Sequence, residues 1–175
     1  MNDHAFAVAQ WLYNAAFPGA ATIVASGEEH RPILIVGVEG RPLAIVDMSA
    51  APSKDYIFEA HAKFARDASA ASLVDTAAAL LIMEAWTTQL DTTPEGQAVS
   101  ERIVEGELRV QDLPQRRESI IFNVRVGERQ FLASCLIDRA TKSLARAELV
   151  DVAATEGTWL GRAIGNGHGL DRGMN

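Results

Sequence analysis

Two segments of the chain carry paired apolar runs on either side of a two-residue turn. The first spans Pro32 to Met48 and turns at Glu39-Gly40, and the second spans Ser119 to Asp138 and turns at Gly127-Glu128. Apolar runs that are separated by two turn-forming residues are typical of β-hairpins. We therefore predict two hairpins, which indicate an antiparallel sheet.

The register of the second hairpin follows from its turn, if Val126 pairs with Arg129. One face of the resulting ladder is almost wholly apolar, and the other alternates polar with apolar residues, as expected of strands with one buried side. The further opposite pairs that we predict are Val124 with Phe131, Phe122 with Ala133 and Ile120 with Cys135. A third strand is expected over Leu144 to Val150, with Ala145, Ala147 and Leu149 pointing inward.

The first hairpin has a different pattern, because both side-chain parities are apolar. This holds for Ile33-Leu34-Ile35-Val36 and for Leu43-Ala44-Ile45-Val46. Strands that are apolar on both faces are typical of the covered centre of a sheet. We therefore expect the first hairpin to be central, and Pro42 to lie at the start of its second strand.

Helical periodicity appears in three places. Asp3 can cap a helix over residues 4–16, which we expect Pro18-Gly19 to end, and Thr22 to Ser26 then reads as a strand. Ser53 is a good cap for a second helix through Ala68. Its expected apolar stripe is Ile57, Ala60, Phe64 and Ala68, with His61 inside the apolar sector.

Thr93 can cap a helix, Pro94 suits its first position, and the charge of Glu95 is favourable in its first turn. We therefore predict a short third helix that ends at Val104. The stretch from Leu73 to Gln89 is ambiguous, because its alanines favour a helix and its aliphatic run favours a buried strand. We predict a strand over residues 76–88. One face of that strand would carry Ala78, Leu80, Ile82, Glu84 and Trp86.

These elements indicate a single α+β domain over residues 1–160. We expect a mainly antiparallel sheet of about six strands, in an order that the sequence leaves open, with the two principal helices packed on one face. A chain of 175 residues can bury one core and is short for two domains. Residues 161–175 contain five glycines and are expected to form a C-terminal tail.

The balance of charge argues against nucleic acid as a direct partner. The formal net charge is −7, and no basic stripe is present to neutralise phosphates. An acidic inhibitor of a nucleic-acid-handling complex stays open, if acidic residues gather in one patch. The residues that could do so are Glu28, Glu29, Asp91 and Glu95.

Cys135 is the one cysteine of the chain, so no intramolecular disulfide can form. This fits a reducing cytoplasm. Its place on the core face of a strand favours a small buried hydrophobe over a reactive thiol. No apolar stretch reaches the roughly 20 residues of a membrane span, so we expect no membrane partner.

We expect no metal site and no cofactor. The four histidines, His4, His30, His61 and His168, are scattered, and the spacing Gly161-x-x-x-Gly165-x-Gly167 lacks the lysine of a phosphate-binding loop. One soft constellation remains, namely His61, Glu84 and Arg116. If the sheet brings these residues together, they could perform acid-base chemistry on an anionic substrate. Equally, they could be a hydrogen-bonded lock between helix and sheet.

A candidate contact surface lies on the outer parity of the second hairpin. Ile121, Leu132 and Leu136 are apolar there, next to Arg117 and Glu118 at the start of the first strand. A covering helix or a second subunit could bury such a face. We therefore predict a homo-oligomer or another protein partner at this face.

Two runs of residues precede the second hairpin in a fixed order. They are Leu81-Ile82-Met83-Glu84-Ala85-Trp86 and Pro114-x-Arg116-Arg117-Glu118-x-Ile120. Over residues 80–139 the chain resembles uncharacterised small bacterial and phage-encoded proteins. The resemblance implies that the strand and the hairpin occur together, and it implies no activity.

Three functions follow as hypotheses. The favoured one is a cytoplasmic, non-enzymatic binding or assembly protein that forms a homo-oligomer. The second is a small enzyme that uses His61, Glu84 and Arg116, and the third is the acidic inhibitor.

Overall fold

The computed structural model describes residues 3–70, 76–88, 90 and 93–153. The end of the predicted domain at residue 160 and the predicted tail 161–175 lie outside these residues. The described elements, in chain order, are α1 (His4–Ser26), β1 (Ile33–Val38), β2 (Arg41–Asp47), α2 (Lys54–Ala70), β3 (Ala77–Thr87), α3 (Pro94–Val104), a 3-10 turn (Val110–Asp112), β4 (Arg117–Val126), β5 (Arg129–Asp138), β6 (Ser143–Leu144) and β7 (Val150–Asp151).

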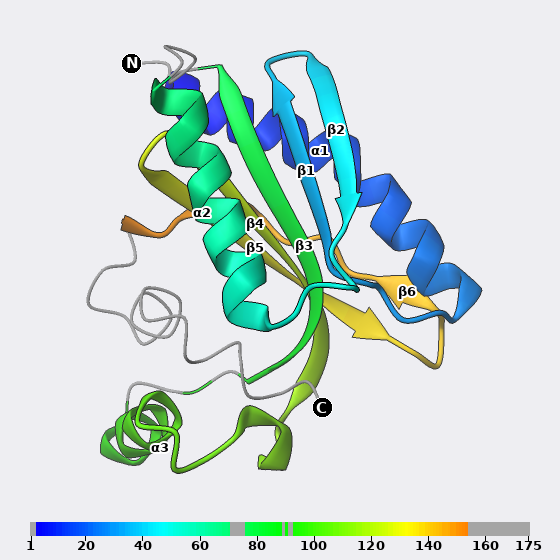
Figure 1. Cartoon of the computed structure of the whole chain (residues 1–175). Coiled ribbons are helices and arrows are strands. Elements are labelled where there is room, and N and C mark those ends of the chain that lie inside the picture. The colour runs from blue at the N-terminus through cyan, green and yellow to red at the C-terminus, as the bar shows by residue number, and fades with distance from the viewer. Residues whose placement is uncertain (1–2, 71–75, 89, 91–92, 154–175) are drawn as a thin grey trace.

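The strands form one sheet in the order β2-β1-β3-β4-β5-β6 (Figure 1), and β7 pairs with the edge of β5 that faces away from β4. Every neighbouring pair of strands is antiparallel. The predicted α+β class and the antiparallel sheet are therefore confirmed. The connection from β2 to β3 passes through α2 and skips over β1, so β2 and β3 run in the same direction.

The predicted register of the second hairpin is confirmed. Val126 lies opposite Arg129, and the ladder continues through Phe122 opposite Ala133 to Ile120 opposite Cys135. The strand predicted over residues 76–88 is also confirmed as β3, which lies between β1 and β4.

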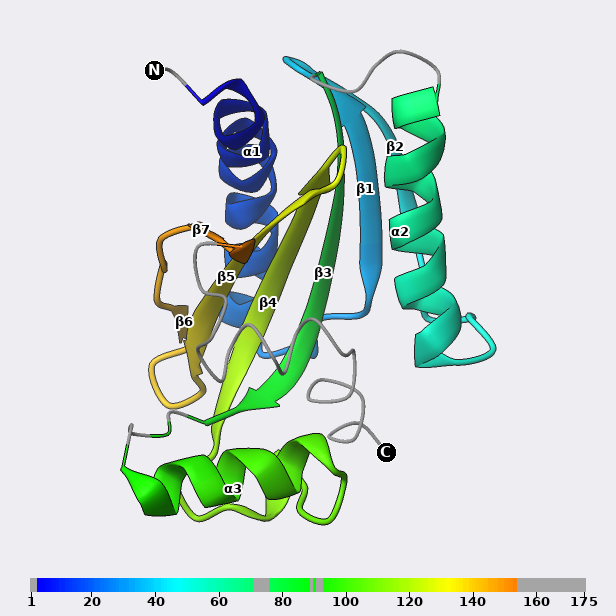
Figure 2. The same cartoon turned by 90° about the vertical axis from the view of Figure 1, so that its left-hand side faces the viewer.

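The two principal helices lie on opposite faces of the sheet, as Figure 2 shows, so the prediction that they share one face is wrong. Successive side chains of β3 point to opposite faces, and both sets are apolar. Leu80 and Ile82 belong to the core under α1, whereas Leu81 and Met83 belong to the core under α2. Because β3 is apolar on both sides, each face needs a helix to cover it.

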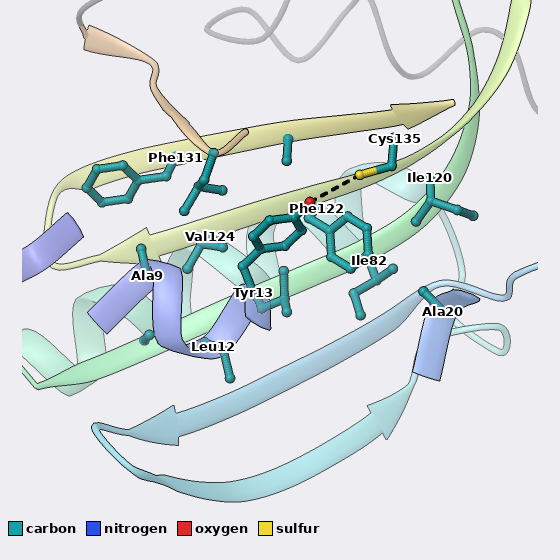
Figure 3. Close-up of a cluster of buried hydrophobic side chains, with 14 of the residues drawn as sticks. Ala9, Leu12, Tyr13, Ala20, Ile82, Ile120, Phe122, Val124, Phe131 and Cys135 are labelled. Atoms are coloured by element: carbon teal, nitrogen blue, oxygen red, sulfur yellow. Dashed lines mark hydrogen bonds between the residues drawn. The ribbon is translucent and has the colours of Figure 1, made fainter. Parts of the chain in front are cut away.

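The core under α1 is built from aromatic and aliphatic side chains of α1, β3, β4 and β5 (Figure 3). Phe122 and Phe131 are completely buried, and burial of each contributes roughly 2 kcal/mol to stability. The Tyr13 hydroxyl donates to the Ala147 carbonyl at 2.7 Å and lies 3.3 Å from the sulfur of Cys135. Cys135 is fully buried, as the sequence predicted for a small hydrophobe.

Helix α1 is longer than predicted and runs through Pro18 and Gly19. Asp3 caps it as expected, since its side chain accepts the Phe6 N–H at 3.2 Å. Pro18 is exposed, so its ring and its missing N–H face solvent rather than the sheet. The helix ends at Gly27, whose φ of 84° gives the left-handed conformation of a helix end. The strand expected over Thr22 to Ser26 is therefore helix.

Helix α2 begins after Ser53, whose hydroxyl accepts the Tyr56 N–H at 3.1 Å, as predicted. The residues that it buries differ by a small rotation from the predicted stripe. Ile57, His61 and Ala65 are buried, whereas Phe64 is 36% exposed. Rotation of α2 toward His61 lets the imidazole form a hydrogen bond with the Ala79 carbonyl of the sheet. The side chain of Ala68, the last residue of the predicted stripe, is outside the described residues.

The first hairpin forms with the predicted turn but does not lie at the centre of the sheet. β2 is the outermost strand, and all seven of its residues are exposed. Neither α1 nor α2 reaches far enough across the sheet to cover it, because both helices pack on the strands nearer the middle. The expectation that both strands are covered on both faces is therefore wrong for β2.

The third strand predicted over Leu144 to Val150 is only partly formed. Ser143–Leu144 pairs with one end of β5, and Val150–Asp151 pairs with the other end. The residues between them leave the sheet, where the Ala147 carbonyl accepts from Tyr13 and Leu149 joins the core.

Helix α3 lies beyond the end of the sheet and packs on a separate small cluster of Leu90, Ile103 and Leu113 (Figure 2). Thr93 caps it through the Gly96 N–H at 3.2 Å, and Pro94 is its first residue, as predicted. Among the described residues, none of the helices is both long and apolar enough to cross a lipid bilayer.

Candidate functional site

The three residues that the sequence suggested as an acid-base site are not brought together. His61 lies under α2, with its Nε2 atom 2.9 Å from the carbonyl oxygen of Ala79. Glu84 lies on the other face of the sheet, because it is directly opposite Ile120, a residue of the core under α1. The sheet itself therefore separates the imidazole from the carboxylate.

His61 is positioned as a structural residue. Its side chain is 1% exposed, and burial lowers its pKa to about 4. A carbonyl oxygen can only accept, so the imidazole donates its Nε2 proton to Ala79. The nearby guanidinium of Arg125 lowers the pKa further. A neutral, covered imidazole that ties α2 to β3 has no route to a substrate.

Glu84 belongs instead to an ion-pair cluster at one end of the sheet. The guanidinium of Arg139 donates to Glu84, and its Nε atom donates to Glu118 at 2.6 Å. The backbone N–H of His30 donates to the other oxygen of Glu84 at 3.0 Å. This cluster joins the loop after α1 to β3, β4 and the end of β5. The cluster is a structural connection between elements, which is the alternative that the sequence left open. Its members are Glu84, Glu118 and Arg139 rather than His61, Glu84 and Arg116.

Arg139 was missed by the sequence reasoning, although a signal for it was present. The confirmed register pairs Leu136 with Ser119, so its continuation sets Ile137 opposite Glu118, and Arg139 shares the parity of Ile137. A cation at that position can offset the two carboxylates Glu84 and Glu118 on neighbouring strands.

Arg116 is an exposed residue that lies elsewhere. Its guanidinium lies 5.2 Å from the centre of the Trp86 ring, and it also donates to the Leu113 carbonyl at 3.4 Å. Arg117 is exposed at the start of β4. Among the described residues, neither arginine forms a hydrogen bond or an ion pair with His61 or Glu84.

The apolar outer face of the second hairpin is covered by this chain's own elements. Ile121 and Leu132 are 2% and 3% exposed, in the core under α2, and Leu136 is half-buried. The covering helix thus accounts for Ile121 and Leu132 without a second subunit.

Exposed apolar side chains gather in a different place. Among the described residues, six large hydrophobic side chains are exposed, and five of them belong to β2 or α2. We call these five residues the β2 surface: Leu43 (53% exposed), Ile45 (68%), Val46 (43%), Tyr56 (50%) and Phe64 (36%). The sixth is Val150, at 37%, on β7.

Tyr56 and Phe64 lie on the side of α2 that is nearer to β2. They are eight residues apart, with Ala60 between them, so all three follow one side of the helix. Arg66 projects from the opposite side, and its charge acts on Arg125 of β4. Since α2 packs on β3, with β4 on one side of it and β1 and β2 on the other, the aromatic side faces the β2 edge.

The backbone of β2 is open along its outer edge. Among the described residues no strand pairs there. Met48 donates its N–H to the Pro32 carbonyl at 2.8 Å, and such inward-facing positions alternate along an antiparallel pair. Val46 and Ala44 therefore bond toward β1, whereas Ile45 and Asp47 direct their N–H and C=O groups outward.

Two shallow pockets in the described part of the chain are lined by none of the exposed apolar residues of β2. One of about 390 Å³ lies between α2 and the loop before β1, and includes His30. His30 is 3% exposed, its Nδ1 atom lies 2.7 Å from the Arg31 carbonyl, and burial lowers its pKa. The other pocket, of about 410 Å³, lies between α1 and residues 146–149. Within the described part of the chain, no three potential metal ligands of the His, Cys, Asp or Glu type converge.

The acidic patch that an inhibitor would need cannot be assembled from the described residues alone. Glu28 and Glu29 are exposed in the loop after α1, and Glu95 is exposed in the first turn of α3. Asp91 lies outside the described residues.

Comparison of the chain with protein families, with curated proteins and with solved structures finds no match. The geometry of the β2 surface therefore carries the functional argument.

Proposed function

We propose that the chain is a non-enzymatic binding and assembly protein that forms a homo-oligomer through the β2 surface. The observation that carries the proposal is the exposure of three large aliphatic side chains, Leu43, Ile45 and Val46, on the open edge strand β2, with Tyr56 and Phe64 also exposed on α2. Isolated exposed apolar residues are ordinary, but exposed apolar side chains along an unpaired edge strand are a mark of a pairing interface.

The composition of the β2 surface supports this role. It combines aliphatic side chains on a strand with an aromatic side chain, Tyr56, that offers both apolar area and a hydroxyl. Removing each of these side chains from water in an interface would contribute on the order of 1 kcal/mol.

The enzyme hypothesis has less support. His61 is covered and neutral, Glu84 is neutralised by Arg139, and the sheet lies between them. A cytoplasmic location stays a prediction that rests on the lone, buried Cys135.

A single charge on β2 tests the proposal. Ile45→Asp is expected to make the chain monomeric at concentrations at which the unchanged chain is oligomeric, because it replaces the most exposed apolar side chain of the edge strand with a carboxylate. Sedimentation velocity over a range of concentrations measures the change. Ile45 is 68% exposed, so the variant is expected to keep its fold, which circular dichroism checks.

Val150→Asp is the matched control, because Val150 is also an exposed aliphatic residue on a strand but lies on β7. It is expected to associate like the unchanged chain. A chain that stays monomeric at every concentration, or an equal loss of association in both variants, would overturn the proposal.

A further inference from the structure

We infer that the oligomer is a dimer in which β2 of one copy pairs antiparallel with β2 of a second copy, so that the two sheets become one. This inference rests on the proposed function and specifies the partner and the mode of contact. It is argued from the backbone, the charges and the symmetry of the edge.

The backbone of β2 offers unused hydrogen-bonding groups to such a partner. Ile45 and Asp47 direct their N–H and C=O groups away from β1, and no described strand accepts them. A row of outward backbone groups at a sheet edge is a template for another strand. A partner that packed only on the side chains would leave these backbone N–H and C=O groups bonded to water.

The ends of β2 carry opposite charges, which select the partner's direction. Arg41 begins the strand and Asp47 ends it, and both are exposed. Antiparallel pairing of two copies brings each Arg41 toward the Asp47 of the other, whereas parallel pairing would set like charges side by side. The only ion-pair partner of Asp47 among the described residues is Arg31, which is 3.8 Å away at the surface.

The start of β2 limits where the two strands can pair. Pro42 has no N–H, and the ladder with β1 shifts by one residue between Val36 and Gly37. Pairing is therefore confined to residues 43–47, where the apolar side chains lie. Prolines and bulges commonly prevent uncontrolled pairing at the edge of a sheet. In β2 they leave one short segment free to pair.

Two-fold symmetry makes this contact self-limiting. The symmetry axis is perpendicular to the sheet, so equivalent faces of the two copies lie on the same side. Val46 pairs with Leu34 of the core under α2, and it therefore lies on the same face as Tyr56 and Phe64. Ile45 pairs with Ile35 and lies on the other face. Both faces of the junction are thus apolar, and β2 is the only edge strand of the described residues that exposes large apolar side chains on both of its faces.

Charge reversal tests the direction of pairing. Arg41→Asp alone and Asp47→Arg alone are each expected to weaken self-association roughly tenfold, because each creates two like-charged contacts in the symmetric dimer. The double variant restores the opposite charges and is expected to recover most of the affinity. A loss due to misfolding would not be rescued, so the recovery is specific to pairing. Sedimentation equilibrium gives the dissociation constants.

Cysteine cross-linking tests the edge contact itself. Ala44→Cys, Ile45→Cys and Val46→Cys, made one at a time, are expected to give an oxidised covalent dimer most readily at the position nearest the two-fold axis. Val150→Cys is expected to give none, and the native Cys135 is buried and stays unreactive. Cross-linking is read from non-reducing gels.

The two proposals can fail separately. If the unchanged chain is monomeric, both are overturned. If association is abolished by Ile45→Asp, yet the double charge reversal fails to rescue and no cysteine on β2 cross-links, the β2 surface is an interface but edge-to-edge pairing is overturned.

Discussion

At the scale of single residues, the most consequential group is His61. It has its usual pKa of 6.5 in the unfolded chain and a pKa of about 4 in the fold, because burial disfavours the charged imidazole. Below pH 6.5 the unfolded chain binds a proton that the folded chain does not. The stabilising contribution is therefore complete above pH 6.5 and is lost as pH falls toward 4.

We expect the free energy of unfolding to fall by about 1.4 kcal/mol per pH unit in this window, on the order of 3 kcal/mol in all, from His61. Urea unfolding at a series of pH values measures it. His61→Gln is expected to flatten this part of the profile while lowering stability at neutral pH, because the amide fits the Ala79 carbonyl less well.

His4→Gln is the matched control, because the His4 side chain is 49% exposed. It is expected to leave the His61 contribution to the profile in place. His30 is also buried with a lowered pKa, so a residual slope of the same sign is expected in His61→Gln. A His61→Gln profile as steep as that of the unchanged chain would contradict the assignment.

At the scale of elements, α1 shows how a buried face overrides a local breaking signal. Val8, Leu12, Ala16, Ala20 and Val24 are spaced by four residues, and this stripe crosses Pro18-Gly19 without a gap. Tertiary burial of Ala20 and Val24 outweighs the unfavourable helix propensity of the pair. The sequence shows both this stripe and the Pro18-Gly19 signal for a helix end, and burial of the stripe decides between them.

Gly19→Ala is expected to stabilise the protein by about 1 kcal/mol, because Gly19 lies within the helix and a Cβ there meets no atom within 4 Å. Chemical denaturation measures the change. Gly27→Ala is the matched comparison and is expected to destabilise, because its φ of 84° is strained for any residue with a side chain. Equal effects of the two substitutions would show that α1 ends before Gly19.

The β4–β5 hairpin shows the limit of local prediction for strands. Its register was predictable because the turn and the alternation of side chains are local. The position of β2 was not, because β1 and β2 have similar apolar composition and only β1 gains a second neighbour, β3. An edge strand and a central strand differ in what lies beside them, which the strand's own sequence does not encode.

At the scale of the whole molecule, two cores share one sheet. β3 and β4 contribute side chains to both cores, so neither core can form without the strands of the other. This arrangement favours unfolding as one cooperative unit.

We expect Leu12→Ala, in the core under α1, and Ile57→Ala, in the core under α2, each to lower the free energy of unfolding by roughly 2–4 kcal/mol. In both variants tryptophan fluorescence and far-ultraviolet circular dichroism should report one coincident transition. Two separate transitions in either variant would show that the faces unfold independently.

The sequence by itself determined the elements whose signals are local: the two hairpins with their turns, the register of β4 with β5, the caps of all three helices and the α+β class. It also marked His61 and Glu84 as residues with unusual surroundings. Periodicity, turn chemistry and capping involve neighbours within a few residues, so they can be read along the chain.

Only the tertiary structure decided which residues meet. It placed α1 and α2 on opposite faces, which separated His61 from Glu84. Glu84 forms an ion pair with Arg139 instead. It covered Ile121 and Leu132 and left β2 bare, which moved the expected contact surface from the second hairpin to the first. Order in a sheet and coverage of its faces depend on pairings between distant segments, and those pairings are fixed by the packing of the whole chain.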